Sequence, residues 1–457
     1  MSRAGWFVTL ACLGCFAWRL FSPPLIGIAN NGDFAKIAGP LSLGPAGQPD
    51  DRFLYVTRDY KRAPQYAWQS RYRSSEAILA RIAYRVSRPF QRHESFDIRW
   101  MGAVHLTLII LALAWLMTAL LPLGAAAQLA AGLSAGFILG DAAYLGYCNS
   151  FYTDAAALAG LLLSVAALTD LAVRGGSRLR LAGAAAGALL LAASKTQHVL
   201  LAVPLALLIW LLVRNRAALA ASLAVLAGGA LFVAISPPGY RSDPLFNLIF
   251  YKLTPHSPDA ARDLAVLGLG SEHLAYVGLH AYLPGAPTTN RDYMEDLVRR
   301  VSLGRVMRFY ATDPRRAAAI IWRDLTVAAP IIQPGEFGNY TVESGRPPGT
   351  RASGYWTGLE SRLLSRTPWL MPAWLIAAAI VCLAVPSKPA WICLGVVAMA
   401  AIELATASLL DSLDTSRHLL IFHVLLETTF SFAVTAAACA VPAVRRWLRA
   451  GRASIPA

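Results

Sequence analysis

Polar and ionisable residues gather in four short stretches, each beside a long apolar segment. The stretches are Asn30–Asp33, Asp141–Asp154, Ser194–His198 and Asp411–His418. A carboxylate such as Asp33 can take a proton from a hydroxyl group as a general base. The cations Lys195 and Arg417 can hold an anionic group such as a phosphate. The residue types therefore suit proton abstraction beside an anion.

The composition indicates what must position these stretches. The chain has 457 residues, of which 56% are hydrophobic and 15% are charged, whereas soluble proteins carry roughly a quarter charged residues. Apolar segments recur at about the 17–25 residues needed to cross a bilayer. We therefore expect an all-α polytopic membrane protein. The formal net charge of +15 fits anionic lipid head groups of the bilayer. No aromatic-basic cluster suggests a nucleic-acid partner.

About ten transmembrane helices are expected. Their approximate cores are 5–22, 101–121, 124–140, 154–173, 181–194, 198–213, 217–236, 370–385, 390–410 and 418–441.

The short basic loops predict the orientation. Arg174, Arg178 and Arg180 lie between two spans and Lys388 between two others, and such loops are usually cytoplasmic. Both termini are then cytoplasmic, and all four polar stretches share the outer face. The first loop is Arg-rich, but long loops report topology poorly.

This topology divides the chain into three parts. Residues 1–236 form an N-terminal transmembrane module that includes the first outer loop, 23–100. Residues 237–369 form a second outer, periplasmic segment. Residues 370–457 form the C-terminal helices and a cytoplasmic tail.

Local patterns predict some structure in the outer segments. Residues 74–86 form an amphipathic helix with Ile78, Ile82 and Val86 on one face, which could lie at the membrane surface or pack on the second segment. Helices are also expected at 291–310 and 315–329, and a loop at 334–351.

Each polar residue also has a structural interpretation. Asp154 is a good residue for starting a helix, and Tyr152 suits an aromatic belt. Lys195 could extend its ammonium to the interface, and Arg417 could form a salt bridge to Asp414 or Asp411. Asp33 has the weakest structural explanation, since no helix is obvious behind it.

Several strings, taken in order, resemble one family of membrane enzymes. NNGDFAKIAGPL, YLGYCNSFYTDAAAL, SKTQH, GEFGNYTVESGRPP and DTSRHLLIF look similar to a bacterial subfamily of the GT-C glycosyltransferases with an NGDF-type motif in the first loop. The resemblance implies a GT-C-like bundle with two soluble segments on the outer face. Many members of the family have paired acids in the first loop, whereas Asp33 has no adjacent acid. This difference leaves metal dependence open.

The resemblance implies an inverting transfer of a sugar from a polyprenyl-phosphate carrier to a glycan, lipid or protein acceptor. This would occur at the outer face of the bacterial inner membrane, towards the periplasm. Asp33 would be the base, and Lys195, Arg417 and His418 would bind phosphate. The sugar would be held by Asn31, Asn149, Tyr152, Gln197 and His198. Asp141 and Asp154 would orient the acceptor or, with Asp33, hold Mg²⁺ or Mn²⁺, although no spacing requires a metal.

Ionisable residues within the last two spans support a different class of function. Glu403, His423 and Glu427 lie at a depth where such residues often mark transport paths. The alternative is a transporter or flippase of lipid-linked sugars, although no internal repeat is visible. A structural polar lock between the helices, or a scaffold subunit of a polysaccharide assembly complex, would also fit.

Overall fold

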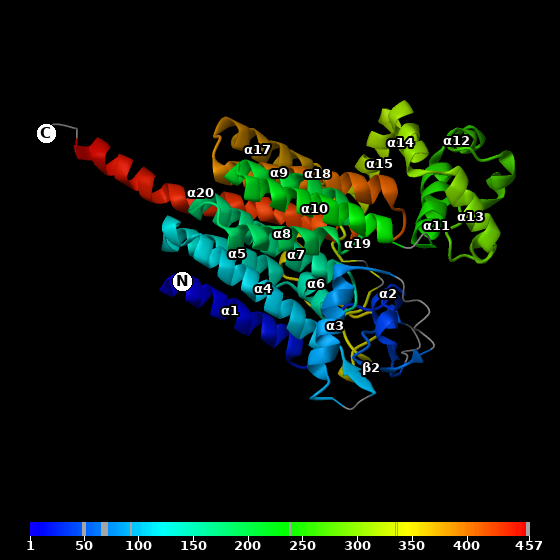
Figure 1. Ribbon diagram of the computed structural model, residues 1–457, viewed down its shortest axis with the longest axis horizontal. Coiled ribbons are helices and arrows are strands. Elements are labelled where there is room, and N and C mark those ends of the chain that lie inside the picture. Colours follow the sequence, from blue (N-terminus) through cyan, green and yellow to red (C-terminus); the bar gives the residue numbers. More distant parts are fainter. Residues whose placement is uncertain are drawn as a thin grey trace.

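The computed structural model describes residues 1–47, 52–64, 72–91, 94–236, 239–333, 335 and 337–453. Long helices lie side by side in a bundle (Figure 1). In the described part of the chain, seven helices are long and apolar enough to cross a membrane. They are α1 (Arg3–Phe21), α4 (Arg99–Ala119), α7 (Asp154–Arg174), η5 (Thr196–Leu201) continued by α9 (Ala202–Val213), α10 (Arg216–Ile235), α18 (Lys388–Leu410) and α20 (Leu420–Ala453).

Two bent helix pairs bring the count to as many as nine spans. Helix α5 (Ala125–Leu139) meets α6 (Ala142–Leu145) and η4 (Gly146–Asn149) at 68°, and α16 (Trp356–Arg366) meets α17 (Leu370–Ala384) at 100°. The span expected at 181–194 is α8 (Arg178–Ala192), whose 15 residues are shorter than a full crossing requires. The prediction of an all-α polytopic membrane protein is confirmed.

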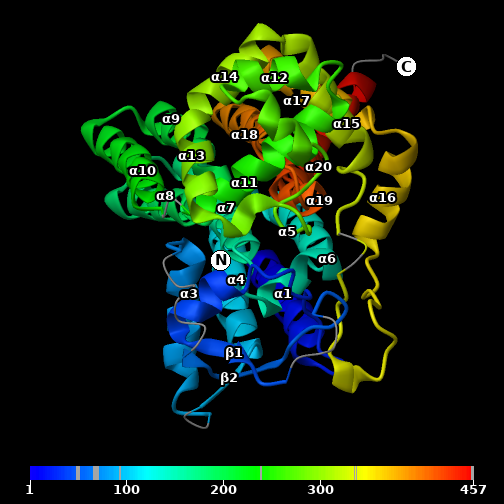
Figure 2. The same cartoon turned by 90° about the vertical axis from the view of Figure 1, so that its right-hand side faces the viewer.

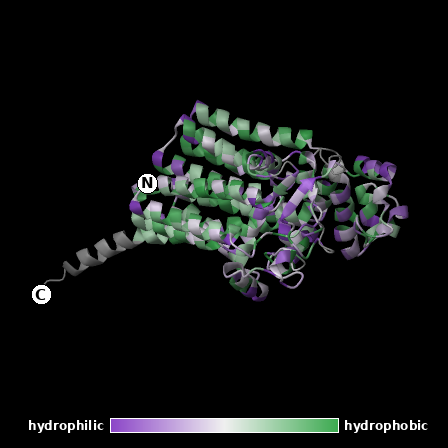
Figure 3. Cartoon of the chain, turned by 90° about the horizontal axis from the view of Figure 1, so that it is seen from below, coloured by the Kyte–Doolittle hydropathy of each residue, from purple (hydrophilic) through white to green (hydrophobic). Residues whose placement is uncertain are grey.

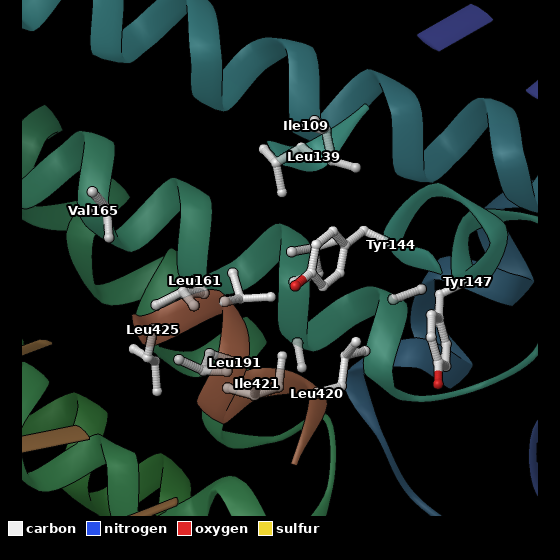
Figure 4. Close-up of a cluster of buried hydrophobic side chains, with 14 of the residues drawn as sticks. Ile109, Leu139, Tyr144, Tyr147, Leu161, Val165, Leu191, Leu420, Ile421 and Leu425 are labelled. Atoms are coloured by element: carbon white, nitrogen blue, oxygen red, sulfur yellow. The ribbon is translucent and has the colours of Figure 1, made fainter. Parts of the chain in front are cut away.

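Small residues allow α7 and α8 to pack closely in the bundle. A Cβ on Gly160 would lie 2.5 Å from the Leu191 backbone nitrogen, and one on Gly187 would lie 2.8 Å from that of Ser164. Such close approach is a usual way of associating helices in lipid. Figure 4 shows part of the adjoining core, to which Leu161, Leu191 and Leu425 contribute.

The outside of the bundle is apolar. Phe7, Leu207, Leu231 and Ile380 are each more than half exposed on different helices. Figure 3 shows hydrophobic colour along the bundle and hydrophilic colour at the end that carries the outer segments. Large apolar side chains facing outward along parallel helices are expected of a surface solvated by lipid.

The first outer loop contains a small sheet that the sequence patterns did not reveal. It also holds the short helix α2 and the longer helix α3. Its antiparallel strands have the order β1-β2-β3, with Leu43 opposite Arg62 and Asp59 opposite Asp97. These elements are α2 (Ala35–Ala38), β1 (Leu43–Pro45), β2 (Asp59–Arg62), α3 (Ser75–Ser87) and β3 (Ser95–Asp97).

Helix α3 agrees with the prediction for residues 74–86. The Ser74 side chain caps it by accepting from Glu76 N–H, a usual role for serine. The expected apolar face points outward, since Ile78, Ile82 and Val86 are 57%, 44% and 49% exposed. An apolar stripe exposed along a helix at the end of a transmembrane bundle suits the membrane interface.

The second outer segment is helical and has its own buried core, which includes Phe250, Leu264, Leu297 and Phe309. The helix expected at 291–310 is divided because Ser302 starts a new helix by accepting from Arg305 N–H. The described residues of 334–351 form loop with one short 3₁₀ turn. The helices are α11 (Gly239–Phe246), the π-helix η6 (Asn247–Leu253), α12 (Ala260–Leu267), α13 (Arg291–Arg300), α14 (Leu303–Thr312) and α15 (Pro314–Val327).

Both outer segments lie at the same end of the bundle, opposite the two chain termini (Figures 1 and 2). A β-bridge between Ile26 and Tyr340 joins them. The short helix α19 (Thr415–His418) lies between α18 and α20 at this end. The fold therefore brings all the candidate residues of the first and last polar stretches to one end of the molecule.

Candidate active site

The loop after α1 forms a tight turn that carries Asp33. The Asn30 side-chain oxygen accepts from the N–H groups of Gly32 (2.7 Å) and Phe34 (3.3 Å). The Asn31 side-chain oxygen accepts from Asp33 N–H (3.0 Å). Gly32 has a φ of 110°, which residues with a Cβ rarely adopt. The Asn-Asn-Gly sequence is thus what this turn requires.

Tyr152 and the 338–339 stretch hold the turn against the bundle. The Tyr152 hydroxyl donates to the Ala29 carbonyl (2.8 Å) and accepts from Asn31 N–H (3.0 Å). The N–H groups of Gly27 and Ala29 donate to carbonyls at 338–339, both at 3.0 Å. Two motifs distant in the sequence therefore fix the position of Asp33.

Asp33 lies between two cations. Its Oδ1 is 2.6 Å from Lys36 Nζ and its Oδ2 is 2.9 Å from Arg417 Nη2. Burial alone would raise the pKa of Asp33, but Lys36 and Arg417 outweigh it and hold that pKa well below its usual range. Its side chain is 28% exposed. Asp33 is therefore an ionised carboxylate that a substrate can reach.

Arg417 is buried and faces three carboxylates. Besides Asp33, its guanidinium lies 3.6 Å from Asp154 and 3.5 Å from Asp414. Its Cζ is 4.9 Å from the centre of the Tyr152 ring, a cation–π arrangement. The salt bridge to Asp414 that the sequence suggested as an alternative is thus one of several contacts. Arg417 therefore connects the segment between α18 and α20 to the loop after α1.

The Asp411–His418 loop completes the cluster. Asp414 has a φ of 52° and accepts from Asn31 Nδ2 at 2.6 Å. His418 Nδ1 pairs with Asp411 Oδ2. Burial lowers the pKa of His418, and the nearby Asp411 carboxylate opposes this effect. Burial would raise the pKa of Asp411, but His418 and other nearby groups lower it.

Lys195 presents a buried cation that makes no hydrogen bond within the described part of the chain. Burial lowers the pKa of Lys195, while the nearby carboxylates of Asp154 and Asp411 oppose this effect. A lysine that extends to the interface would hold its ammonium in water, so that interpretation does not fit. An anion bound here would relieve the cost of the desolvated charge.

A groove of about 840 Å³ adjoins this region. Its walls are α3, α8 and α10, and Ser75 N–H and the Ser74 hydroxyl bond the carbonyls of Ala193 and Ser194 at 2.8 Å. Leu189, Leu231 and Ile235 supply apolar lining, and Arg73 and Arg81 also line the groove. The α8 side of the groove thus ends at Ala193, two residues before Lys195.

The structure places three of the expected sugar ligands in supporting positions. Asn149 is fully buried and donates to the carbonyls of Leu20 (2.9 Å) and Ile26 (2.7 Å). Gln197 Nε2 donates to Glu403 and to the His418 carbonyl (2.9 Å). His198 Nε2 lies 3.2 Å from Glu403 Oε1. These contacts hold the site together, so we assign no sugar contact to the three side chains.

Asp141 occupies a helix-capping position. Its carboxylate accepts from Ala143 N–H (2.9 Å) at the start of α6 and from the N–H groups of Trp356 (2.8 Å) and Thr357 (3.1 Å) at the start of α16. The described contacts of Asp141 do not include the Asp33 cluster, so its expected role as an auxiliary acid is replaced by a structural one. Asp154, by contrast, lies 3.6 Å from Arg417 and therefore belongs to the Asp33 cluster.

The three intramembrane residues of the transporter alternative divide between two separate clusters. Glu403 is held by Gln197 and His198. Glu427 accepts from Tyr144 (2.6 Å) and Trp356 (2.5 Å). His423 Nε2 donates to the Ala329 carbonyl (2.7 Å), and its Nδ1 lies 3.4 Å from Glu360 Oε1. These contacts are those of a polar lock between helices.

Lys36 is the main site residue that the sequence interpretation missed. It follows Asp33 at the i,i+3 spacing that brings side chains together on a helix, and α2 begins directly after the turn. The expectation that no helix follows Asp33 is wrong. A four-residue helix has too few positions to show a periodic pattern.

The described residues contain no group of three His, Cys, Asp or Glu side chains arranged to hold a metal ion. Asp33 and Asp154 instead face Arg417, and Asp411 lies near Lys195. A divalent cation would have to displace these cations, so the cluster fits Mg²⁺ or Mn²⁺ poorly.

Comparison with known proteins identifies one family. A family model described as the YfdI N-terminal transmembrane domain matches residues 4–451, nearly the whole chain. Comparisons with curated proteins and with solved structures gave no match.

Proposed function

The chain belongs to the YfdI N-terminal transmembrane domain family, and we propose that it is an inverting glycosyltransferase. It moves a sugar from a polyprenyl-phosphate carrier to a hydroxyl group of a glycan, lipid or protein acceptor. The observation that carries this proposal is the buried, unpartnered Lys195 ammonium, which lies with Arg417 beside the reachable carboxylate of Asp33.

The reaction follows from the order of these groups. The acceptor hydroxyl oxygen attacks the anomeric carbon, and its proton passes to Asp33. The bond from that carbon to the phosphate oxygen breaks, and the electron pair stays on the phosphate. Lys195 and Arg417 stabilise the charge that develops there, which is a large contribution in a water-poor site. The attack comes from the face opposite the leaving group, so the anomeric centre inverts.

Donor binding would also activate the base. Without a donor, Arg417 neutralises Asp33 at 2.9 Å, and a carboxylate in such a pair is a weak base. A donor phosphate competes for the same guanidinium. When Arg417 turns to the phosphate, the pKa of Asp33 rises towards a value better suited to proton transfer.

The groove suits the lipid part of the donor. It opens between α3 and α10, where Ile78 and Leu231 are exposed, and one wall ends at Ala193, two residues before Lys195. An isoprenoid chain in the groove would place its phosphate near this ammonium. Arg73 and Arg81 would attract the phosphate to the entrance.

The proposed location is the bacterial inner membrane with the site towards the periplasm. The end of the bundle away from the site carries Arg174 at the end of α7 and Arg178 and Arg180 at the start of α8, on either side of a short loop. By the positive-inside rule, this loop favours the cytoplasmic side.

Release of free carrier tests the proposal. Purified protein is incubated with membranes of a strain lacking the enzyme, as the acceptor source, and with a polyprenyl-phosphate sugar labelled in the lipid. Wild-type protein should release polyprenyl phosphate, and D33N should reduce the rate by about 10²–10⁴-fold, the usual value of a general base. D59N, which changes an exposed carboxylate in the same loop, is the matched control. Equal rates for wild type and D33N would contradict the proposed role of Asp33.

A further inference from the structure

One side of α16 carries both leucines and arginines. Leu359 and Leu363 are 61% and 52% exposed, and Arg362 and Arg366 are exposed as well. Their spacing of three and four residues places all four side chains on one side of the helix. Neither arginine forms a salt bridge with a residue that the structure describes. We refer to Leu359, Arg362, Leu363 and Arg366 as the α16 face.

Helix α16 runs across the direction of the bundle. It meets α17 at 100°, and α17 lies along the other long helices (Figure 1). The view onto the end that carries the outer segments shows α16 at the edge of the molecule (Figure 2). Because the long helices cross the bilayer, α16 lies close to the plane of the membrane, and its exposed face is open to the surroundings of the bundle.

Contacts with α20 fix the height of α16. The Trp356 indole N–H donates to the Glu427 carboxylate, and Glu360 Oε1 lies 3.4 Å from His423 Nδ1. Helix α20 starts at Leu420 at the site end of the bundle, so His423 and Glu427 are its fourth and eighth residues. At a rise of about 1.5 Å per residue, Glu427 lies about 10 Å below that end. Helix α16 therefore lies at the level of the lipid rather than above it.

Exposed tryptophans lie at the same end of the neighbouring spans. Trp18 is 72% exposed near the end of α1, and Trp369 is 54% exposed directly before α17. The Arg19 side chain connects α1 to the stretch before α16, because its Nη2 donates to the Ser353 carbonyl at 2.9 Å. Tryptophan is enriched where the acyl chains meet the head groups. The two indole rings thus indicate that α16 lies in this boundary region.

The chemistry of the α16 face suits a phospholipid with a negatively charged head group. Guanidinium groups bind phosphate oxygens through paired N–H donors, and an arginine can extend its side chain from this depth to the head groups. Leucines on the same side of a helix in the boundary region enter among the acyl chains. Two cations that form no salt bridge within the described residues favour a head group with a net negative charge.

We propose that the α16 face binds an anionic phospholipid in the leaflet at the site end of the bundle. Arg362 and Arg366 bind its phosphate, and the leucines pack against its acyl chains. The start of α16 is held by Asp141, which accepts from the N–H groups of Trp356 and Thr357. The arginines thus stand on a fixed helix, which limits the entropy lost on binding. This inference holds whichever reaction the candidate site performs.

Fluorescence in nanodiscs tests the depth of the α16 face. A single cysteine replaces Leu359 on a background without the six native cysteines and carries the fluorophore NBD. The control carries NBD at position 299 of α13, where the arginine side chain is 75% exposed. NBD at position 359 should emit at shorter wavelength and lose at least half of its emission to doxyl-labelled lipids, and NBD at position 299 should do neither. Emission at position 359 that matches position 299 would overturn the proposal.

A titration tests the choice of head group. The protein labelled at position 359 is titrated in micelles with phosphatidylglycerol, and the shift in emission gives a dissociation constant. R362Q/R366Q should bind at least fivefold more weakly, whereas R299Q/R300Q, which removes the same charge from exposed positions of α13, should bind like wild type. Unchanged affinity in R362Q/R366Q, or equal affinity for phosphatidylcholine, overturns the role of the arginines. An equal shift with inorganic phosphate would show that the site does not require a lipid and would also contradict the proposal.

Discussion

Arg417 connects the charges of the candidate site at the scale of single residues. Its guanidinium contacts Asp33, Asp154 and Asp414, and it lies over the Tyr152 ring. A planar group with several fixed N–H donors can meet these partners together, whereas an ammonium is a point charge. The site therefore needs arginine specifically.

We expect R417K to lower the transfer rate at least tenfold although the charge is retained. The lysine could hold one carboxylate but would leave the others without a partner and would lose the contact with Tyr152. Carrier release measures the effect. R323K, at a half-exposed arginine of α15, is the control, and wild-type activity in R417K would show that charge alone is sufficient.

The pKa of Asp33 predicts a shift in the pH profile. Lys36 lowers that pKa, so K36M should raise it. The acid limb of kcat/KM, which reports ionisation of the free enzyme, should move to higher pH, because more of the base is protonated at a given pH. K61M, at an exposed lysine of β2, should leave the limb in place. An unshifted acid limb in K36M would show that Lys36 does not influence the pKa of the base.

Part of the candidate site is brought together by the structure as the sequence predicted, although its function stays a prediction. Asp33, Lys195, Arg417 and His418 were selected because each adjoins an apolar segment, and the structure brings them together. Asn149 belonged to the same stretches, but its amide is used to hold the chain after α1. Residue type and position at a span end do not reveal whether a side chain points into a site or binds a neighbouring backbone.

At the scale of elements, α3 joins the membrane interface to the site. Its outer face exposes Ile78, Ile82 and Val86, and its inner face carries Glu76. The Glu76 carboxylate lies 3.1 Å from His105 Nε2 on α4 and accepts from Ala156 N–H on α7. One buried acid thus fixes the wall of the groove to two helices.

Loss of this acid should destabilise the protein. E76A leaves His105 Nε2 and Ala156 N–H without the Glu76 carboxylate in a buried place, at about 1–3 kcal/mol for each group. We expect the free energy of unfolding in mixed micelles to fall by about 2–4 kcal/mol. R85A, on the exposed face of the same helix, serves as the control. Equal stability of E76A and R85A would show that the contact with α4 and α7 is not needed.

The period of the apolar residues predicted α3 but not its orientation. Ile78, Ile82 and Val86 would suit either a protein core or a lipid interface. The buried face is built from the small residues Ala77, Ala80 and Ala83 together with Glu76, a pattern without a strong hydrophobic signal. The three-stranded sheet was missed because strands of three or four residues are too short to show alternation.

At the scale of the whole molecule, two segments far apart in the sequence enclose one end of the bundle. The Ile26–Tyr340 bridge attaches the second segment to the first loop. Lys252 of the second segment donates to the Asp411 carbonyl and attaches it to the end of α18. Hydropathy predicted the spans well, because lipid requires each helix to satisfy its own backbone. The long-range contacts depend on side-chain geometry that hydropathy does not report.

The topology predicts a labelling pattern in intact cells. On a background without the six native cysteines, cysteines at positions 61 and 299 should react with an impermeant maleimide. A cysteine at position 179, in the exposed first turn of α8, should react only after the cells are opened. Reaction of position 179 in intact cells without reaction of positions 61 and 299 would place the site on the other side of the membrane than proposed.

The central claim is that the sugar leaves its lipid on this protein, and a doubly labelled donor tests it most directly. Proteoliposomes containing the protein receive polyprenyl-phosphate sugar labelled separately in the sugar and in the lipid, together with a saccharide acceptor. We predict one free carrier for every sugar that reaches the acceptor, and neither product with D33N. If the two labels remain joined and cross the bilayer together, and D33N does not affect this, the protein is a transporter and the account is contradicted.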